Sequence, residues 1–328
     1  MGLLLAMITA VFFPGVIIRV KSIASGRKGP GILQPWMNIW VLLRKGSVIS
    51  TTTSYIFRIA PVIYLSTIIC AIMLLPFPGM PSLLGFEGDF VLFAYLLALG
   101  KFLFILGAMD TGSSFEGMGA NREALYSMLA EPVFFILFGT LAMLTGHTSM
   151  QQIFESFQFS GHNSFIIGFI AVYLLVQIAM IENSRMPVDD PKTHLELTMI
   201  HEVMILDHSG FDLALVQIGT TLKFAMYGLL IANFLVPADA MQIMVTGGNW
   251  LKTGEKIIVN KHGGIGVVVS QIGVYFTLQV MFASMIGLME SFRARKKLVR
   301  NPQFIVTLSS IALVAFILVL LITFKMIR

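Results

Sequence analysis

Carboxylates and histidines gather in one stretch of this chain, residues 182–210, which lies between two apolar segments. Six of the 17 acidic residues lie there: Glu182, Asp189, Asp190, Glu196, Glu202 and Asp207. Burial beside apolar segments raises the pKa of a carboxyl group and a nearby base lowers it, so such groups can hold or release a proton. These residue types therefore favour proton or ion transfer, and a solvated connector between two apolar segments is the plainer alternative.

Cap and stop signals predict a short helix inside this stretch. Asp190 is a typical N-cap, Pro191 suits the first helical position, and Ser209-Gly210 is a stop signal. We therefore expect a helix over roughly residues 191–207.

Three histidines in the same stretch, His194, His201 and His208, recur every seven residues. On a helix that step rises about 10.5 Å, which is too far for two imidazoles to share one ion at ligand distances of about 2 Å. We therefore expect no metal site in this chain. Beside the acids of this stretch, the histidines are interpreted as members of an acidic surface that change charge near neutral pH.

Composition sets the class of protein. Hydrophobic residues make up 56% of the chain and charged residues 12%, and the mean hydropathy is +0.86, values that one water-soluble core cannot accommodate. A spanning helix needs about 20 mostly apolar residues. Eight runs qualify, at roughly 2–20, 57–77, 89–108, 132–146, 163–182, 211–235, 264–287 and 304–326. The sequence thus predicts an all-α polytopic membrane protein that forms one integral membrane domain over residues 1–328, with a fourth span that can begin earlier, near Ala124.

The positions of the basic residues predict the topology. Arg19 and Lys21 follow the first apolar run and no base precedes it, so we expect an uncleaved anchor with its N-terminus outside. Lys and Arg excess then places four loops on the cytoplasmic side of an inner (cytoplasmic) membrane: 21–56, 109–131, 184–210 and 291–303. The loop 236–262 falls outside by this count although it carries three lysines, an exception that we cannot explain physically.

Charge and cysteine content narrow the classes of partner. The net charge of +5 comes from bases that flank apolar runs, where they orient spans and meet anionic lipid, so nucleic-acid binding is not expected. The single cysteine, Cys70, lies inside an apolar run, so this chain can hold neither a disulfide nor a cysteine-ligated cluster. Any redox metals must belong to partner subunits.

The segment 27–45 predicts a helix on the membrane surface. Gly29-Pro30-Gly31 favours a tight turn, and the apolar residues that follow recur at helical spacing over a length too short to span a bilayer. A cytoplasmic amphipathic helix here is either an interfacial anchor or a platform that covers a cavity and meets a soluble subunit.

Ionisable residues also lie inside or near the apolar runs: Arg58, Lys101, Glu131, Lys223 and Glu290. Glu131 precedes Pro132 at a predicted membrane boundary, and Lys223 lies near the middle of the sixth run. Charges at such depth are costly and mark functional sites by default. A proton relay and a set of structural ion pairs are both consistent with these residues.

The acid-rich stretch resembles a known signature. Glu182, Arg185, Pro187, Asp189, Glu196-Leu197 and Ser209-Gly210 are similar to the pattern of the complex I subunit 1 family, Glu-x-x-(Arg/Lys)-x-Pro-Phe-Asp followed by acids, Glu-Leu and Tyr-Ser-Gly. The turn at 27–31 resembles that family's Arg-Arg-Gly-Pro turn. Val188, Lys192, His194 and Asn38 depart from the quinone-reducing branch, and about three extra residues precede Ser209-Gly210. Asp110–Ser113, Gly119-Ala120, Arg122–Ala124 and Glu131-Pro132 resemble the branch of membrane-bound nickel-iron hydrogenases and formate hydrogenlyase instead.

The resemblance implies a membrane anchor and coupling subunit that links electron transfer in soluble partners to proton or sodium translocation. Iron-sulfur clusters and nickel-iron are then expected in hydrogenase-like large and small subunits, with antiporter-like subunits beside the chain in the membrane. The candidate coupling residues are Glu131, Glu182, Asp189 and Glu196, with Glu123, Glu202 and Lys223 behind them. The candidate docking residues are Arg27, Lys28, Arg185, Asp190, Asp207, Arg293 and Arg295. The quinone-site subunit of an NADH-quinone oxidoreductase, a stand-alone ion transporter and a purely structural anchor remain alternatives.

Overall fold

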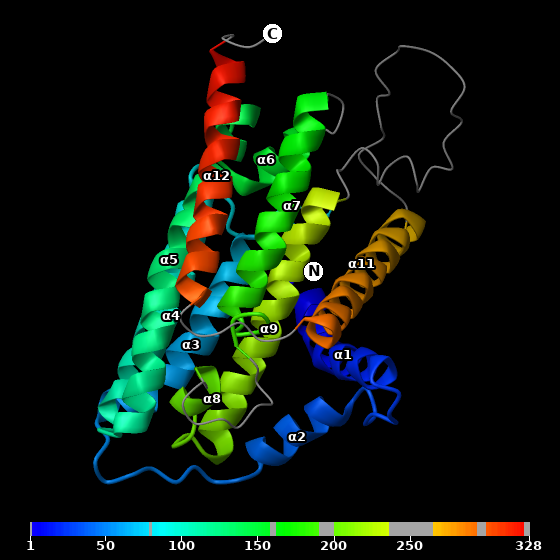
Figure 1. The fold of residues 1–328 in the computed structure, drawn as a ribbon. Helices are drawn as coiled ribbons and strands as arrows, with labels where there is room; N and C mark the ends of the chain where they lie inside the picture. The colour runs from blue at the N-terminus through cyan, green and yellow to red at the C-terminus, as the bar shows by residue number, and fades with distance from the viewer. Residues whose placement is uncertain are drawn as a thin grey trace.

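The computed structural model describes residues 2–78, 81–157, 162–189, 200–235, 265–293 and 300–324, and its regular elements in these ranges are α-helices (Figure 1). The helices are α1 (Gly2–Ala24), α2 (Gln34–Leu43), α3 (Tyr55–Leu74), α4 (Asp89–Asp110), α5 (Ser114–Thr145), α6 (Met150–Ser156), α7 (His162–Glu182), α8 (His201–Met204), α9 (Gly210–Leu235), α11 (Ile265–Phe292) and α12 (Asn301–Thr323). The predicted all-α fold is confirmed.

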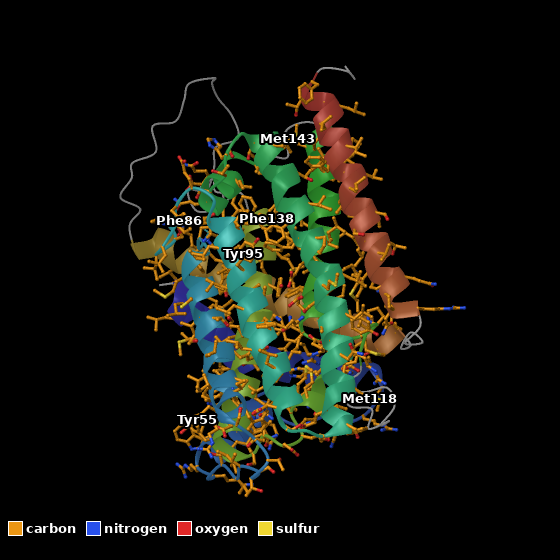
Figure 2. The ribbon with its side chains drawn as sticks, turned by 90° about the vertical axis from the view of Figure 1, so that its left-hand side faces the viewer. Tyr55, Phe86, Tyr95, Met118, Phe138 and Met143 are labelled. Atoms are coloured by element: carbon orange, nitrogen blue, oxygen red, sulfur yellow. The ribbon has the colours of Figure 1, made fainter. Side chains whose placement is uncertain are left out.

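Eight of these helices are long and apolar enough to cross a membrane, namely α1, α3, α4, α5, α7, α9, α11 and α12. They correspond one by one to the eight predicted runs. Figure 2 shows Tyr55 and Met118, near the starts of α3 and α5, at one end of the bundle, with Phe86 and Met143 at the other. The consecutive spans α3, α4 and α5 therefore alternate in direction, as the topology prediction requires. The end that carries α2 and α8 is the end predicted to be cytoplasmic.

The fourth span, α5, differs from its prediction. It starts at Ser114 instead of near Ala124 or Pro132, so most of the predicted 109–131 loop is helix, and Glu131 and Pro132 lie in its interior. Small residues explain the extension, because the first turns pack closely on the segment around α8. A Cβ on Gly119 would come 2.9 Å from the Ile200 carbonyl oxygen. A proline inside a membrane helix is tolerated where neighbouring groups satisfy the freed carbonyl.

The helix α9 lies at the centre of the bundle and contacts α1, α2, α3, α7 and α11 (Figure 1). Two glycines permit the close approach. Gly219 lies against the Tyr64 ring of α3, and Gly228 lies against the Gln279 side chain of α11. The flanking pairs α3 with α4, α5 with α12 and α1 with α11 complete the packing. Any polar side chain on the inward faces of α9 is therefore surrounded by protein.

The surface helix at 27–45 is confirmed as α2, which packs on α9 and α1. Ile39 is its buried residue, and Met37 and Trp40 are exposed. The predicted helix 191–207 is wrong over much of its described part, because only His201–Met204 are helical and residues 205–207 form a turn. Side-chain contacts replace helical pairing there, since the Asp207 amide donates to Glu116. Residues 190–199, including the expected cap at Asp190-Pro191, lie outside the described residues.

Ser209 and Gly210 join the start of α9 to the loop before α3. The Val48 amide donates to Ser209 Oγ at 2.8 Å, and that hydroxyl donates back to the Val48 carbonyl at 3.0 Å. Gly210 has a φ of +51°, and a Cβ there would overlap the backbone of Gly46. The backbone angle and the close approach both require glycine at position 210.

We expect Gly210→Ala to destabilise the protein. The left-handed backbone costs a side-chain-bearing residue about 1–2 kcal/mol, and the overlap with Gly46 adds to that. Gly139→Ala is the matched control, because its Cβ would meet nothing within 4 Å in the middle of α5. Thermal unfolding in detergent should show a lower midpoint for Gly210→Ala than for Gly139→Ala, and equal midpoints would contradict this account.

Candidate functional site: a row of buried charges

Four charged side chains from four membrane spans form a continuous row inside the bundle, called the charge row below. It comprises Glu123 of α5, Lys101 of α4, Glu182 of α7 and Lys223 of α9. Lys101 Nζ lies 2.9 Å from Glu123 Oε1 and 3.1 Å from Glu182 Oε2, and Lys223 Nζ lies 2.7 Å from Glu182 Oε2. Their side chains are between 2% and 10% exposed. The row is neutral when all four groups are charged.

Local structure places each member of the charge row. Glu182 is the last residue of α7, where helix carbonyls lack intrahelical donors, and Lys223 Nζ also donates to the Glu182 carbonyl at 2.9 Å. Gly100, beside Lys101, allows α4 to approach Thr67 of α3. Beyond the end of α7, Ser184 Oγ donates to Glu123 Oε2 at 3.4 Å. Removing one member of such a buried set leaves an uncompensated charge.

Glu131 lies beside the charge row but is not part of it. Its side chain is exposed on the outside of α5, at mid-helix, and no described residue forms an ion pair with it. A cavity of about 30 Å³, called the small cavity below, is lined by Glu131, Lys101 and Glu182 among others. The small cavity therefore brings Glu131 close to Glu182. Two lysines, Lys101 and Lys223, compensate the charge of Glu182.

A second charge cluster joins the ends of three segments. The Glu290 side chain, at the end of α11, is fully buried and accepts from Lys21 of α1 at 2.8 Å and from Arg185 at 3.3 Å. The Arg185 guanidinium also lies 4.9 Å from the centre of the Phe224 ring. Arg185 was predicted to dock a partner. These contacts hold Arg185 within the chain, and its docking role stays a prediction.

A larger cavity of about 510 Å³, called the large cavity below, opens between α1, α2, the 183–185 turn, the 201–208 segment and α9. Two polar groups in its lining are buried without a hydrogen-bond partner among the described residues: Asn183 Oδ1 and the His208 ring nitrogens. Unsatisfied buried groups cost about 1–3 kcal/mol each. Water or a polar ligand in the large cavity would satisfy them.

The two described histidines of the acid-rich stretch are not the titrating surface groups that the sequence predicts. Burial lowers the pKa of His201 to about 4, against the opposing attraction of Glu123, and burial lowers the pKa of His208 to about 4. His208 stacks on Phe57 with ring centres 4.1 Å apart. Both histidines are therefore neutral at neutral pH. His194 lies outside the described residues.

Of the predicted coupling residues, the structure brings Glu123, Glu182 and Lys223 into direct contact through Lys101 and places Glu131 beside them. Asp189 is elsewhere: it is buried and accepts from the Ile200 and His201 amides at 3.3 Å, which closes the loop. Glu202 lines the large cavity. Glu196 lies outside the described residues.

Of the predicted docking residues, Arg27, Lys28, Asp207 and Arg293 are exposed, as docking requires. Asp190 and Arg295 lie outside the described residues, as does the basic loop 236–262.

Three buried charges carry more of the site than the sequence analysis assigned to them. Lys101 is the centre of the charge row, Glu290 is the centre of the second cluster, and Glu116 receives the Asp207 amide at 3.1 Å. An ionisable residue inside an apolar run was the available signal for Lys101 and Glu290. Glu116 gave no such signal, because the segment around it reads as a loop.

We expect Lys223→Met alone to destabilise the protein by about 3–5 kcal/mol, because it leaves the row with an uncompensated negative charge. The double variant Lys223→Met/Glu182→Gln should be less destabilised, since it leaves the neutral Lys101–Glu123 pair. Lys45→Met, at an exposed position, is the control. Denaturation in detergent measures all three. A double variant less stable than Lys223→Met would show that the uncompensated charge does not cause the destabilisation.

Comparison with known proteins shows which family this chain belongs to. The family model described as NADH dehydrogenase matches residues 1–324. The chain is 32% identical to hydrogenase-4 component C of Escherichia coli over 243 residues, 74% of this chain and 76% of the relative. It is 26% identical to formate hydrogenlyase subunit 4 of Escherichia coli over 239 residues, 73% of this chain and 77% of that protein.

The same comparisons include quinone-reducing relatives and a solved structure. A subunit of the NADH-quinone oxidoreductase of Solibacter usitatus is 28% identical over 238 residues, 69% of this chain and 56% of that protein. The fold matches a chain of the membrane-bound sulfane sulfur reductase, an archaeal respiratory membrane complex, with a TM-score of 0.77 over 97% of this chain and 96% of that chain at 18% identity. The chain therefore belongs to the NADH dehydrogenase family, among relatives that include hydrogenase-4 component C and formate hydrogenlyase subunit 4.

Proposed function

We propose that this chain is the membrane anchor and coupling subunit of an energy-converting redox complex of the membrane-bound hydrogenase type. In this role it links electron transfer in soluble partners to movement of protons or sodium ions through its buried carboxylates. The relatives named hydrogenase-4 component C and formate hydrogenlyase subunit 4 support the class of complex. The observation that carries the coupling role is the charge row, which joins four spans and has an exposed carboxylate, Glu131, beside its middle members.

The charge row suits transfer of charge because two of its members are shared: Lys101 contacts two carboxylates, and Glu182 contacts two lysines. Lys101 contacts two carboxylates at nearly equal distances, 2.9 Å to Glu123 and 3.1 Å to Glu182. A proton added to one carboxylate weakens its hold on Lys101, and the ammonium can then shift toward the other. A buried row responds strongly to such a change, because charges attract more in a low dielectric. Charge that arrives at one end therefore alters the pairing at the other.

The end of the row nearest the soluble partners would be Glu123. Ser184, which donates to Glu123, lines the large cavity, and the cavity lies beside α2 at the predicted cytoplasmic end. Redox reactions in a docked subunit change the charge near that cavity. The exposed bases Arg27, Lys28 and Arg293 are suited to hold such a subunit, since rim charges speed and orient association. Iron-sulfur clusters and nickel-iron would reside in the soluble subunits.

The route would leave the charge row at Glu131, which lies outside the row, beside its middle members Lys101 and Glu182. An ionised carboxylate facing hydrocarbon is costly, so Glu131 needs a proton or a polar partner at membrane depth. A second membrane subunit, of the antiporter-like kind, would supply such a partner if it docked on the faces of α4 and α5. Glu131 would then pass the ion or proton between subunits.

The test of this proposal is Glu131→Gln in the intact complex. Glutamine keeps the shape and hydrogen bonding of the side chain and removes its titration, and no ion pair to a described residue is broken. We expect normal assembly and normal electron transfer to an artificial acceptor, with proton or sodium uptake into inverted vesicles lowered by about tenfold or more.

The control for that test is Glu87→Gln, an exposed carboxylate in the loop before α4, which should change neither activity. Uptake at the wild-type level in Glu131→Gln would reject the coupling role of Glu131. The same result for Glu123→Gln would leave the charge row as a structural set of ion pairs.

A second candidate function is the quinone-site subunit of an NADH-quinone oxidoreductase. The large cavity favours it, because about 510 Å³ is within the usual range of ligand pockets and Asn183 and His208 present unsatisfied polar atoms to it. The relatives that are NADH-quinone oxidoreductase subunits also support it.

Metal analysis of the purified complex separates the two candidates. The hydrogenase type predicts nickel together with iron in the soluble subunits, and electron transfer that needs no added quinone. The quinone-reducing type predicts iron without nickel, and activity that stops when bound quinone is extracted and returns when it is added back. Nickel-free complex with quinone-dependent turnover would overturn the hydrogenase assignment.

A further inference from the structure

The small cavity between Glu131 and the charge row has the size and lining of a water site. Its volume of about 30 Å³ exceeds the roughly 10–15 Å³ that one water molecule occupies by this measure, so one or two waters fit. The polar residues in its lining are Lys101, Ser127, Glu131, Glu182 and Tyr227, and the rest are apolar. Ser127 Oγ is buried without a hydrogen-bond partner among the described residues. A water in the small cavity would satisfy it.

Tyr227 is one of these residues, and the proposed coupling function assigns no role to it. It is 1% exposed and lies in α9, four residues after Lys223. Residues four apart share one face of a helix, so Tyr227 follows Lys223 by one turn on the side that faces Glu182. Tyr227 lines the small cavity together with Glu182 and Glu131. A buried phenol is neutral and can accept one hydrogen bond while it donates another.

The other polar residues of the small cavity cannot both accept and donate a hydrogen bond from the side of the charge row. Lys101 is held between two carboxylates, and a lysine ammonium donates hydrogen bonds but cannot accept one. Ser127 can do both, but it lies on α5, the same helix as Glu131, four residues away. Tyr227 approaches from α9, the helix that carries Lys223, and therefore reaches the cavity from the side of the charge row.

We propose that the small cavity holds one or two water molecules and that the Tyr227 hydroxyl, with these waters, carries protons between Glu182 and Glu131. The inference rests on the proposed coupling function and names its connecting step. In that step, the phenol oxygen accepts a proton from the donor side as its own proton leaves to the water or carboxylate on the other side. One carboxyl group loses a proton and the other gains one. Tyr227 is a neutral phenol before and after, and no electron is transferred.

The test replaces Tyr227 with Phe in the intact complex, which removes one hydroxyl and keeps the ring. Tyr275→Phe is the matched control: Tyr275 is fully buried in α11, its hydroxyl lies 3.3 Å from Thr9 Oγ1, and it does not line the small cavity. Both variants lose one buried hydroxyl. We expect Tyr227→Phe to lower proton uptake per electron transferred by about tenfold or more, and Tyr275→Phe to leave it unchanged.

Electron transfer to an artificial acceptor is measured in the same vesicles and should be unchanged in both variants. A structural role for the Tyr227 hydroxyl would instead lower assembly and electron transfer together. Wild-type uptake per electron in Tyr227→Phe overturns the proposal.

Ser127 provides a second test that does not depend on the folding of Tyr227→Phe. Ser127→Val fills part of the small cavity with methyl groups, and Ser127→Ala enlarges it while removing one hydroxyl. We expect Ser127→Val to lower uptake per electron and Ser127→Ala to retain most of it, because water replaces the missing hydroxyl. Equal uptake in the two variants would show that the cavity is not on the route.

The glutamate variants keep failure of this inference distinct from failure of the coupling function. If Glu131→Gln loses uptake while Tyr227→Phe and Ser127→Val keep it, protons pass Glu131 by another route and the coupling role stands. If Glu131→Gln also keeps wild-type uptake, both the coupling role and the water site as its connecting step are wrong.

Discussion

The cost of placing charge inside a membrane governs this structure. Glu123, Lys101, Glu182 and Lys223 come from four spans, and each would be prohibitively expensive alone in an apolar interior. Their packing therefore fixes α4, α5, α7 and α9 relative to one another more strictly than apolar side chains could, since lipid tails compete with apolar contacts but not with ion pairs. The central position of α9 follows from the same constraint. Lys223 must reach both the carboxylate and the carbonyl of Glu182, which brings α9 against the end of α7.

The turn after α7 connects this row to the rest of the molecule, and it is the part of the chain that carries the family signature. Ser184, which has a positive φ of 48°, donates to Glu123, and Arg185 turns the other way to Glu290 and Phe224. The Val188 carbonyl accepts from Asn301 at the start of α12 at 2.9 Å, and Asp189 closes the loop on Ile200. The turn after α7 thus joins four other spans, α5, α9, α11 and α12, at one point. A small displacement of this turn would reach the charge row and the large cavity together.

Much of the fold could be predicted from the sequence because membrane spans follow from length and apolar content, as the eight spans and the surface helix α2 show. Features that depend on tertiary packing could not. The start of α5 is set by packing of Gly119 on the segment around α8, and Lys101 and Glu290 could be recognised as charges in apolar runs although their partners could not. A seven-residue histidine spacing beside acids predicts exposed imidazoles, but the fold carries His208 into an aromatic cluster, where desolvation keeps it neutral. Local sequence gives the groups that can titrate, whereas tertiary structure decides which of them do.

The surroundings of Glu123 and Glu131 bear on whether the chain acts alone. A stand-alone transporter needs access to water from both sides of the membrane within its own chain. Here one end of the row meets the large cavity beside α2 through Ser184. Its middle members, Lys101 and Glu182, lie beside Glu131 on the outer face of α5, where neighbouring residues such as Met128 are exposed and apolar. Lipid tails stabilise a carboxylate on such a face little, whereas a polar group on another membrane subunit would stabilise it strongly. These surroundings support the proposed coupling function, in which the chain passes charge sideways to a neighbouring membrane subunit, over a transporter that completes the crossing itself.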